Sequence, residues 1–301
     1  MRGSRTWLAS RRRGGGFSMI ELMVSLVIAL AVVVAMLAAA VSVMRSDRHH
    51  DAIAQITDDA SFALSVMRQQ LAQAGFSVPR AASPVAFVMH AFSPVLGCAA
   101  ANFRDVVASI LAPPSCDAPS ADPAASDALA LAYEASVLAA SASNTILGGP
   151  GVSAPLDCLG NSYARTPDPA NGDYFLNDSK FYVADGSLFC HGPGNPAGAA
   201  LVQNVERLKI AYGLAAVAPG EPGSGQVAYY DAAPPIGAPA WGRVVAVRLC
   251  VQVRSASKVV SLDAAATLGT YVDCANVQRT AMDGYLRRTF STTVMLQNRM
   301  S

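Results

Sequence analysis

The sequence RRRGGGFSMIELMVSLVIALAVVVAMLAAAVSVM, residues Arg11–Met44, sets the architecture of the chain. From Leu22 to Met44 it contains no charged residue, and only Ser25 and Ser42 are polar. As a helix this part extends roughly 35 Å at ~1.5 Å per residue, which is enough to cross a bilayer. The stretch therefore predicts one membrane-spanning helix.

The glycines lie before the apolar run, whereas a secretory signal peptide has a shorter apolar core followed by small residues at its cleavage site. The segment Gly16-Phe17-Ser18-Met19-Ile20-Glu21-Leu22 resembles the type IV prepilin motif, although Met19 stands where leucine is more usual. The resemblance implies that a prepilin peptidase cleaves after Gly16 and methylates the new amino terminus at Phe17. Residues 1–16 are then a leader peptide, and residues 17–44 are the transmembrane half of an N-terminal helix.

Glu21 is the carboxylate at the start of the apolar run. An unpaired carboxylate within a bilayer costs on the order of 2.5–3.5 kcal/mol, so Glu21 needs a partner or a protonated form. The resemblance implies that this partner is the free amine of Phe17, on the same or a neighbouring subunit, and that the pair sets the axial register during assembly. The alternative is an interfacial glutamate that faces headgroup water.

The charges are unevenly distributed. Removing the leader changes 22 basic and 21 acidic residues to 17 and 21, a net charge of −4, so the mature chain lacks the basic signature of a nucleic-acid-binding protein. Five arginines precede the span and two follow closely, which places the leader in the cytoplasm and the rest outside by the positive-inside rule. These residues are Arg2, Arg5, Arg11, Arg12 and Arg13, followed by Arg45 and Arg48.

Six cysteines fit an exported domain, where they would oxidise. None forms a C-x-x-C pair, which argues against a zinc or thioredoxin-like site. Among the 15 possible connectivities we favour sequential pairing, because each pair then brackets one loop or strand unit. Free buried thiols are the alternative. The residues are Cys98, Cys116, Cys158, Cys190, Cys250 and Cys274.

After the span, residues 45–75 predict the amphipathic half of the same helix. Apolar residues recur every three or four positions, and Gly75 is a plausible C-terminal cap. His49 and His50 are expected to be solvated helix residues rather than metal ligands. The apolar stripe consists of Ile53, Ile56, Ala60, Leu64, Met67 and Leu71, opposite a polar face with Asp47, Asp51, Asp58, Asp59, Arg68 and Gln69.

Residues 76–126 are rich in Ala, Pro and Ser and predict an irregular, disulfide-pinned excursion. Residues 127–301 predict an antiparallel β domain with disulfides. Its clearest signal is a hairpin around Asp185-Gly186, and the alternation in 127–134 places Leu129, Leu131 and Tyr133 on one face. Further strands are expected at 208–212, 243–254 and 286–296. The predicted fold class is α+β and pilin-like, with a long N-terminal helix packed on a β-sheet domain.

Several segments widen the resemblance, which extends to the PilW family of minor pilins and is scattered over the mature chain. They are Ser61–Leu64, Leu71–Gly75, Val205–Gly213, Trp241–Arg248 and Leu286–Arg299. The resemblance implies a low-abundance subunit that primes or caps a type IV pilus used for twitching motility, adhesion or DNA uptake. The implied partners are other minor pilins, the major pilin, the prepilin peptidase and the inner-membrane assembly platform.

We expect no catalytic residue, metal site or cofactor, and an enzyme is the least expected class, because no Walker loop, G-x-S-x-G or H-E-x-x-H motif occurs. Arg287 and Arg288 are expected at a solvated strand end rather than on DNA, and nucleic acid is not an expected direct partner. Core or rim packing is favoured for Tyr229, Tyr230 and Trp241 over a stacking surface. Turn chemistry is favoured over a calcium loop for Asp168, Asn171, Asp173, Asn177 and Asp178.

Two other functions remain open. A minor pseudopilin of a type II secretion system shares the leader, the helix and the peptidase. A pilus-tip adhesin or binding module would use the excursion at 76–126.

Overall fold

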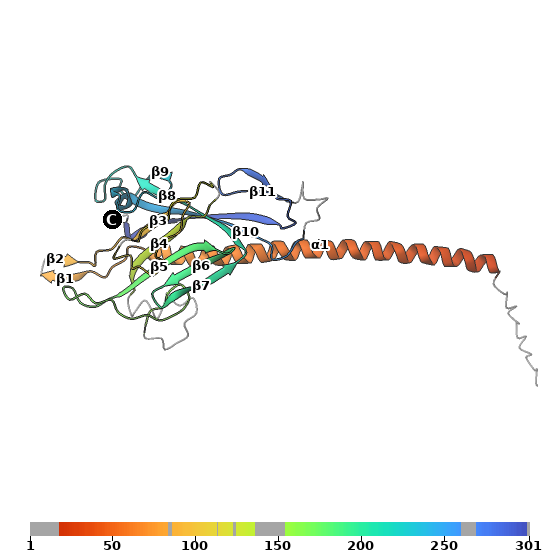
Figure 1. Ribbon diagram of the computed structural model, residues 1–301, viewed down its shortest axis with the longest axis horizontal. Helices are drawn as coiled ribbons and strands as arrows, with labels where there is room; N and C mark the ends of the chain where they lie inside the picture. The colour runs from red at the N-terminus through yellow and green to blue at the C-terminus, as the bar shows by residue number, and fades with distance from the viewer. Residues whose placement is uncertain are drawn as a thin grey trace, which may run out of the picture. The chain divides into compact units, whose positions relative to one another are not determined.

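The computed structural model of the chain describes residues 18–83, 86–112, 114–122, 125–135, 154–259 and 269–299. The chain forms two compact units that divide between His50 and Asp51. Within these ranges the chain forms one long α-helix, short 3-10 helices and several antiparallel sheets (Figure 1). The predicted α+β class with a long N-terminal helix is therefore confirmed.

Helix α1, Met19–Gln73, begins in the first unit and ends in the second. In the second unit its apolar stripe faces the core, as predicted: Ile56, Met67 and Leu71 are fully buried, while Ile53 and Leu64 are half-buried. After the helix, Gly75 adopts a φ of +80°, a conformation that glycine tolerates best.

The chain from 76 to 126 holds three short strands, so it is less irregular than expected. β1, Arg80–Ser83, pairs with β2, Ala86–Val88, and β3, Val95–Cys98, joins a larger sheet. β1 contains no β-branched or aromatic residue, which is why sequence patterns miss it. Its strand conformation depends on pairing rather than on its own preference.

The five-stranded sheet has the order β3-β4-β5-β6-β7 with every pair antiparallel. Its longer strands are β4, Ala128–Ala135; β5, Phe175–Ala184; β6, Ser187–Gly192; and β7, Asn195–Gln203. The predicted hairpin is present, because Asp185 and Gly186 connect β5 to β6 with φ values of 49° and 68°. Two positive φ values are characteristic of the tight type I′ turn.

The four-stranded sheet has the order β13-β10-β8-β9, again antiparallel. Its strands are β8, Val205–Ala215; β9, Val227–Asp231; β10, Val244–Arg254; and β13, Arg287–Met295. The 3-10 helices η1, Pro239–Arg243, and η3, Gln297–Arg299, precede β10 and follow β13. A small hairpin of β11, Thr270–Val272, and β12, Gln278–Thr280, also lies near β13.

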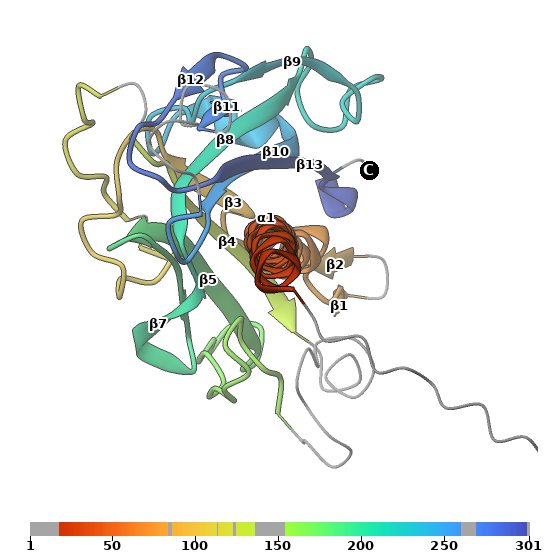
Figure 2. The ribbon, with the colours of Figure 1, turned by 90° about the vertical axis from the view of Figure 1, so that its right-hand side faces the viewer.

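The two larger sheets adjoin at β8, which lies against β4, β5 and β6 (Figure 2). Asp127 helps to fasten this junction, because its carboxylate accepts hydrogen bonds from the Ile210 amide at 2.8 Å and from Lys209 Nζ at 2.8 Å. The two larger sheets of the predicted β domain therefore share one hydrophobic core.

β4 is buried on both faces, whereas the sequence alternation predicted one apolar face. The small side chains of Ala128, Ala130 and Ala132 leave room for close packing on the second face. On the other face, Tyr133 donates to Gln70 Oε1 of α1 at 3.0 Å and accepts from Asn177 Nδ2 of β5 at 3.0 Å. This buried chain of hydrogen bonds connects the helix to two strands.

All six cysteines form disulfides in the sequential order that the sequence favours. The pairs are Cys98–Cys116, Cys158–Cys190 and Cys250–Cys274. The first closes the excursion onto β3, the second joins the 154–166 segment to β6, and the third attaches the β11–β12 hairpin to β10.

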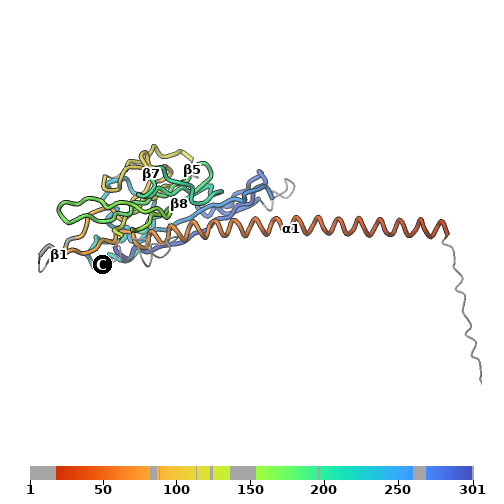
Figure 3. Tube along the Cα trace, turned by 90° about the horizontal axis from the view of Figure 1, so that it is seen from below, coloured from red at the N-terminus to blue at the C-terminus, as the bar shows by residue number. Residues whose placement is uncertain are grey.

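The last described residues cap the end of α1. Asn298 donates from Nδ2 to the carbonyl oxygens of Gln73 at 3.2 Å and Ala74 at 3.3 Å. Figures 1 and 3 both show the carboxyl end beside this part of the chain. The carbonyl group of the last helix residue thus accepts a hydrogen bond from a residue more than 200 positions away in sequence.

Candidate assembly surfaces

The first unit offers an apolar helix surface. Every residue from Met19 to Met44 is exposed, including Leu26 at 71% and Met36 at 67%. This part of α1 is long and apolar enough to cross a membrane by length and composition. A helix that is apolar on every side needs lipid or other helices around it, so this surface can serve both as an anchor and as a packing surface.

Glu21 lies in the first turn of α1 and is exposed. A carboxylate in that position interacts favourably with the positive end of the helix dipole. The Glu21 and Leu22 amides donate to the Ser18 carbonyl at 3.0 and 3.1 Å, so the helix starts at this point. Gly16 and Phe17, the predicted processing residues, lie outside the described residues, and the proposed pairing of Glu21 with the Phe17 amine stays a prediction.

The outer face of α1 in the second unit is acidic. Asp51 and Asp58 are exposed on one side of the helix, and Asp59 lies beside them, half-buried. Burial and the neighbouring charge of Asp58 raise the pKa of Asp59. No ion pair within the described residues involves Asp51, Asp58 or Asp59, which we call the acidic ridge of α1. Its negative charge is of the kind that a cationic partner would stabilise.

The residues considered for a calcium loop are not gathered around one point. Asp168 accepts from the Ala170 and Asn171 amides at 3.0 and 3.1 Å and lies 2.7 Å from His90 Nδ1. The bond from the Asn171 side chain is the largest factor that holds the pKa of Asp168 below its usual value. Asp178 instead accepts from the Ile110 amide and from Lys180. Within the described ranges, no three His, Cys, Asp or Glu side chains are grouped as metal ligands.

A second polar cluster fixes the exit from α1. Glu134 of β4 accepts from Ser77 Oγ and the Val78 amide, both at 2.8 Å, and forms an ion pair with Arg80. The pKa of Glu134 is lowered, since these hydrogen bonds outweigh the effect of burial, which acts in the opposite direction. Residues 77–80 are thereby fastened to the five-stranded sheet.

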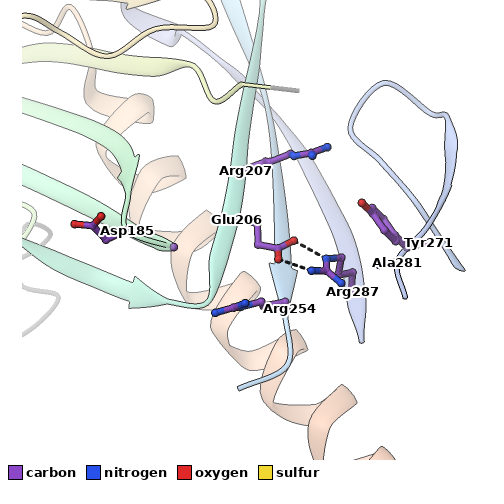
Figure 4. A pocket seen from close by; sticks show the side chains of 8 residues that line it. Asp185, Glu206, Arg207, Arg254, Tyr271, Ala281 and Arg287 are labelled. Carbon is purple, nitrogen blue, oxygen red and sulfur yellow. Dashed lines mark hydrogen bonds and ion pairs between the residues drawn. The ribbon is translucent and has the colours of Figure 1, made fainter. Parts of the chain in front are cut away.

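Arg287 is not at a solvated strand end, which corrects the expectation from sequence. Its side chain is only 9% exposed and binds Glu206 (Figure 4). It also binds Asp283. Glu206 is 81 residues away in sequence, so no local pattern indicates the pair. Arg288, the next residue, is exposed as expected.

The aromatic residues considered for a stacking surface separate into different roles. Trp241 is buried, contacts Tyr212 edge to face at 5.0 Å and donates from Nε1 to the Pro235 carbonyl at 3.0 Å. Tyr230 lies under the Arg248 guanidinium at 4.0 Å, and Tyr229 is 47% exposed. Core and rim packing therefore accounts for Trp241 and Tyr230.

Comparison with protein-family models gives a match to PilW, described as Type IV Pilus-assembly protein W, over residues 173–298. That range extends from just before β5 into η3. The resemblance to the PilW family that the sequence segments indicate is confirmed over this range. A search of curated proteins gives no match.

The solved structures that are similar to the chain include the following two. One is the type IV-like pilin TTHA1219 from Thermus thermophilus, with 11% identity and a TM-score of 0.40, covering 81% of this chain and 98% of that chain. The other is the GspK-GspI-GspJ complex of the type 2 secretion system from enterotoxigenic Escherichia coli. It has 12% identity and a TM-score of 0.28, covering 78% of this chain and 96% of that chain.

Proposed function

We propose that this chain is a minor pilin that takes part in type IV pilus assembly as a priming or tip subunit. The match of residues 173–298 to a pilus-assembly family carries this proposal, because it covers most of both larger sheets. The apolar half of α1 supports it, since a pilin must be stored in a membrane before it is assembled. Motility, adhesion or DNA uptake would then depend on the protein through the pilus.

In this proposal the precursor crosses the inner membrane once, with its C-terminal domain in the periplasm. The five arginines before the apolar run support that orientation. Three disulfides support an oxidising compartment for the second unit. The prepilin peptidase cleaves after Gly16, and the inner-membrane platform then receives the processed subunit.

Assembly exchanges lipid for neighbouring helices around α1. Leu26, Met36 and the other exposed apolar side chains lose lipid contacts and gain side-chain contacts with other minor pilins and the major pilin. When the subunit leaves the membrane, Glu21 becomes surrounded by the apolar side chains of other helices. Its carboxylate is stabilised there by the Phe17 amine of a neighbouring subunit. The ion pair selects one axial position among many that apolar contacts alone would permit.

A tip-binding role is a second candidate, favoured by an apolar cavity of about 530 Å³ beside the first disulfide. The lining residues come from the two segments joined by the disulfide and from the segment after β9; they are Gly97, Cys98, Ala99, Ala101, Pro114, Ser115, Cys116, Asp117, Pro119, Ala233, Pro234, Pro235 and Ile236. Prolines and the disulfide hold these walls rigid, so binding there would cost little ordering. Replacing Ile236 with Asp should abolish attachment without reducing the number of pili if this role is correct.

Processing provides a direct test of the pilin proposal. The protein should be isolated from membranes of cells with and without the prepilin peptidase, and its intact mass measured. We expect a chain that begins at methylated Phe17 in the first case and retains residues 1–16 in the second. An identical, unprocessed chain in both would contradict the proposal.

A further inference from the structure

Three arginines lie close together on the outer face of the four-stranded sheet. Arg254 of β10 is directly opposite Arg287 of β13, and Arg207 of β8 is opposite Gln252, two residues before Arg254. Successive strands thus place three positive charges on one face. Like charges on facing strand positions repel, so this arrangement requires anions.

The carboxylates beside this cluster bind only one of the three arginines, Arg287. Glu206 accepts from Arg287 Nε at 2.7 Å and from Nη2 at 2.8 Å. Asp283 accepts from Nη1 at 2.8 Å and from Nη2 at 2.6 Å. Both carboxylates of the cluster are therefore bound to the same guanidinium.

The other two guanidinium groups have no carboxylate partner among the described residues. Arg254 Nε is buried and has no hydrogen-bond acceptor among the described residues, and its guanidinium lies 4.5 Å from the centre of the Tyr285 ring. Arg207 makes no side-chain hydrogen bond or ion pair within the described part of the chain. A buried donor without an acceptor destabilises the protein, so Arg254 in particular would gain from an added oxygen.

These side chains line an open cavity of about 490 Å³. Figure 4 shows Arg207 and Arg254 on either side of the Glu206–Arg287 pair, with Tyr271 of the β11–β12 hairpin opposite. Asp185, the remaining acidic residue of the lining, lies apart from the arginines on the β5–β6 turn. The cavity is therefore reachable from solvent and has two cationic sites that no carboxylate of the described ranges occupies.

Acidic and basic residues are also unevenly distributed along the sequence. Residues 201–301 contain ten Lys or Arg and six Asp or Glu, a net charge of +4, whereas residues 17–200 contain seven and 15, a net charge of −8. The four-stranded sheet lies in the basic part and the acidic ridge of α1, with Asp51 and Asp58, lies in the other. A second pilin subunit with such a charge distribution could therefore offer carboxylates from its acidic part to the basic part of this one.

We propose that this arginine pocket, defined by Arg207, Arg254 and Arg287, docks a carboxylate-bearing segment of a neighbouring pilin subunit. Carboxylates accept two parallel bonds from a guanidinium, and diagonal neighbours on a sheet are roughly 7–8 Å apart. Acidic residues two apart on a strand, roughly 7 Å at about 3.3 Å per residue, match that separation. The proposal rests on the proposed function and names the chemistry of one of its partners.

The test uses the full-length protein in non-ionic detergent and fluorescein-labelled octaglutamate as the probe, with binding measured by fluorescence anisotropy. R207Q/R254Q should weaken binding at least about tenfold. The matched control R68Q/R104Q removes the same charge from exposed arginines elsewhere and should change binding less than about twofold. Raising NaCl from about 50 to about 300 mM should weaken wild-type binding. Thermal unfolding of each variant confirms that it is folded.

Absence of octaglutamate binding by the wild type, or equal losses in both double variants, would overturn the proposal. Tighter binding of an eight-nucleotide oligothymidylate, lost in R207Q/R254Q, would also overturn it in favour of a phosphate-bearing partner. The proposed function fails separately, when a deletion strain keeps its normal number of pili. If deletion abolishes pili while R207Q/R254Q restores them fully, the docking proposal fails and the function stands.

Discussion

Glu134 shows how single residues hold distant segments together. It is 4% exposed, yet it accepts hydrogen bonds from Ser77, Val78 and Arg80, all more than 50 residues away in sequence. His90 with Asp168 and Arg287 with Glu206 repeat the pattern. Sequence patterns show which residues are charged but not which of them meet, so none of these pairs was predictable.

Replacing Glu134 with Ala should destabilise the protein by about 3 kcal/mol, because Arg80 and two other donors lose their acceptor. Asp117→Ala is a matched control, since Asp117 forms only an exposed ion pair with Arg104 at 3.8 Å. Its expected effect is below about 0.5 kcal/mol. Denaturant unfolding of the full chain in detergent measures both, and equal effects would refute the argument.

Asp283 should make stability depend on pH in the acid range. Hydrogen bonds from Arg287 lower the pKa of Asp283 from 3.8 to about 2. A lowered folded-state pKa means that the stabilisation is complete above about pH 4 and is lost as the pH falls towards 2. Asp283→Asn should therefore flatten the dependence of unfolding free energy on pH between 4 and 2. Glu221→Gln, at an exposed site, should leave it unchanged.

At the scale of elements, the sequence predicts the helices and strands that have a local pattern of apolar or turn residues. The stripe of α1, the Asp185-Gly186 hairpin and the alternation of β10 are all present. β7, whose sequence is NPAGAALVQ, was not predicted, because alanine and glycine give no strand signal and pairing with β6 determines its conformation. The division of the strands between sheets depends on the long-range contacts of β8 with β4, β5 and β6. No local sequence pattern indicates these contacts.

A substitution at Gly186 tests whether the hairpin turn requires glycine. Gly186→Ala should cost about 1 kcal/mol, because a side chain is strained at a φ of +68° even though nothing lies within 4 Å of the added Cβ. Gly242→Ala also meets nothing within 4 Å and has no left-handed φ, so it should be nearly neutral. Equal unfolding free energies for the two variants would show that the turn is not strained as described.

A substitution at Glu21 tests whether this carboxylate in the apolar half of α1 is needed for assembly. Glu21→Ala should remain fully in the membrane after carbonate extraction, because removing a charge favours insertion, yet it should assemble poorly into pili. Ser25→Ala is the control, since the Ser25 hydroxyl is already satisfied by the Leu22 carbonyl at 2.9 Å and its loss should change neither property. Normal pili with Glu21→Ala would exclude the register role.

At the scale of the molecule, the chain combines an apolar helix with a disulfide-bonded domain built around two larger sheets. The anchor and the disulfides were predictable, since composition and cysteine number are properties of the sequence alone. The grouping of arginines on one sheet face was not, because their partners and register arise only on folding. The surfaces proposed for assembly therefore differ in kind: one is apolar and recognisable in the sequence, and the other is charged and is created by the fold.

The measurement that tests the pilus-assembly role most directly is a count of surface pili by negative-stain electron microscopy. A clean deletion strain would be compared with the same strain carrying the gene in trans. We predict that pili become scarce or absent on deletion and return on complementation. An unchanged number of pili in the deletion strain would contradict the account and leave the secretion pseudopilin or the tip-binding role in its place.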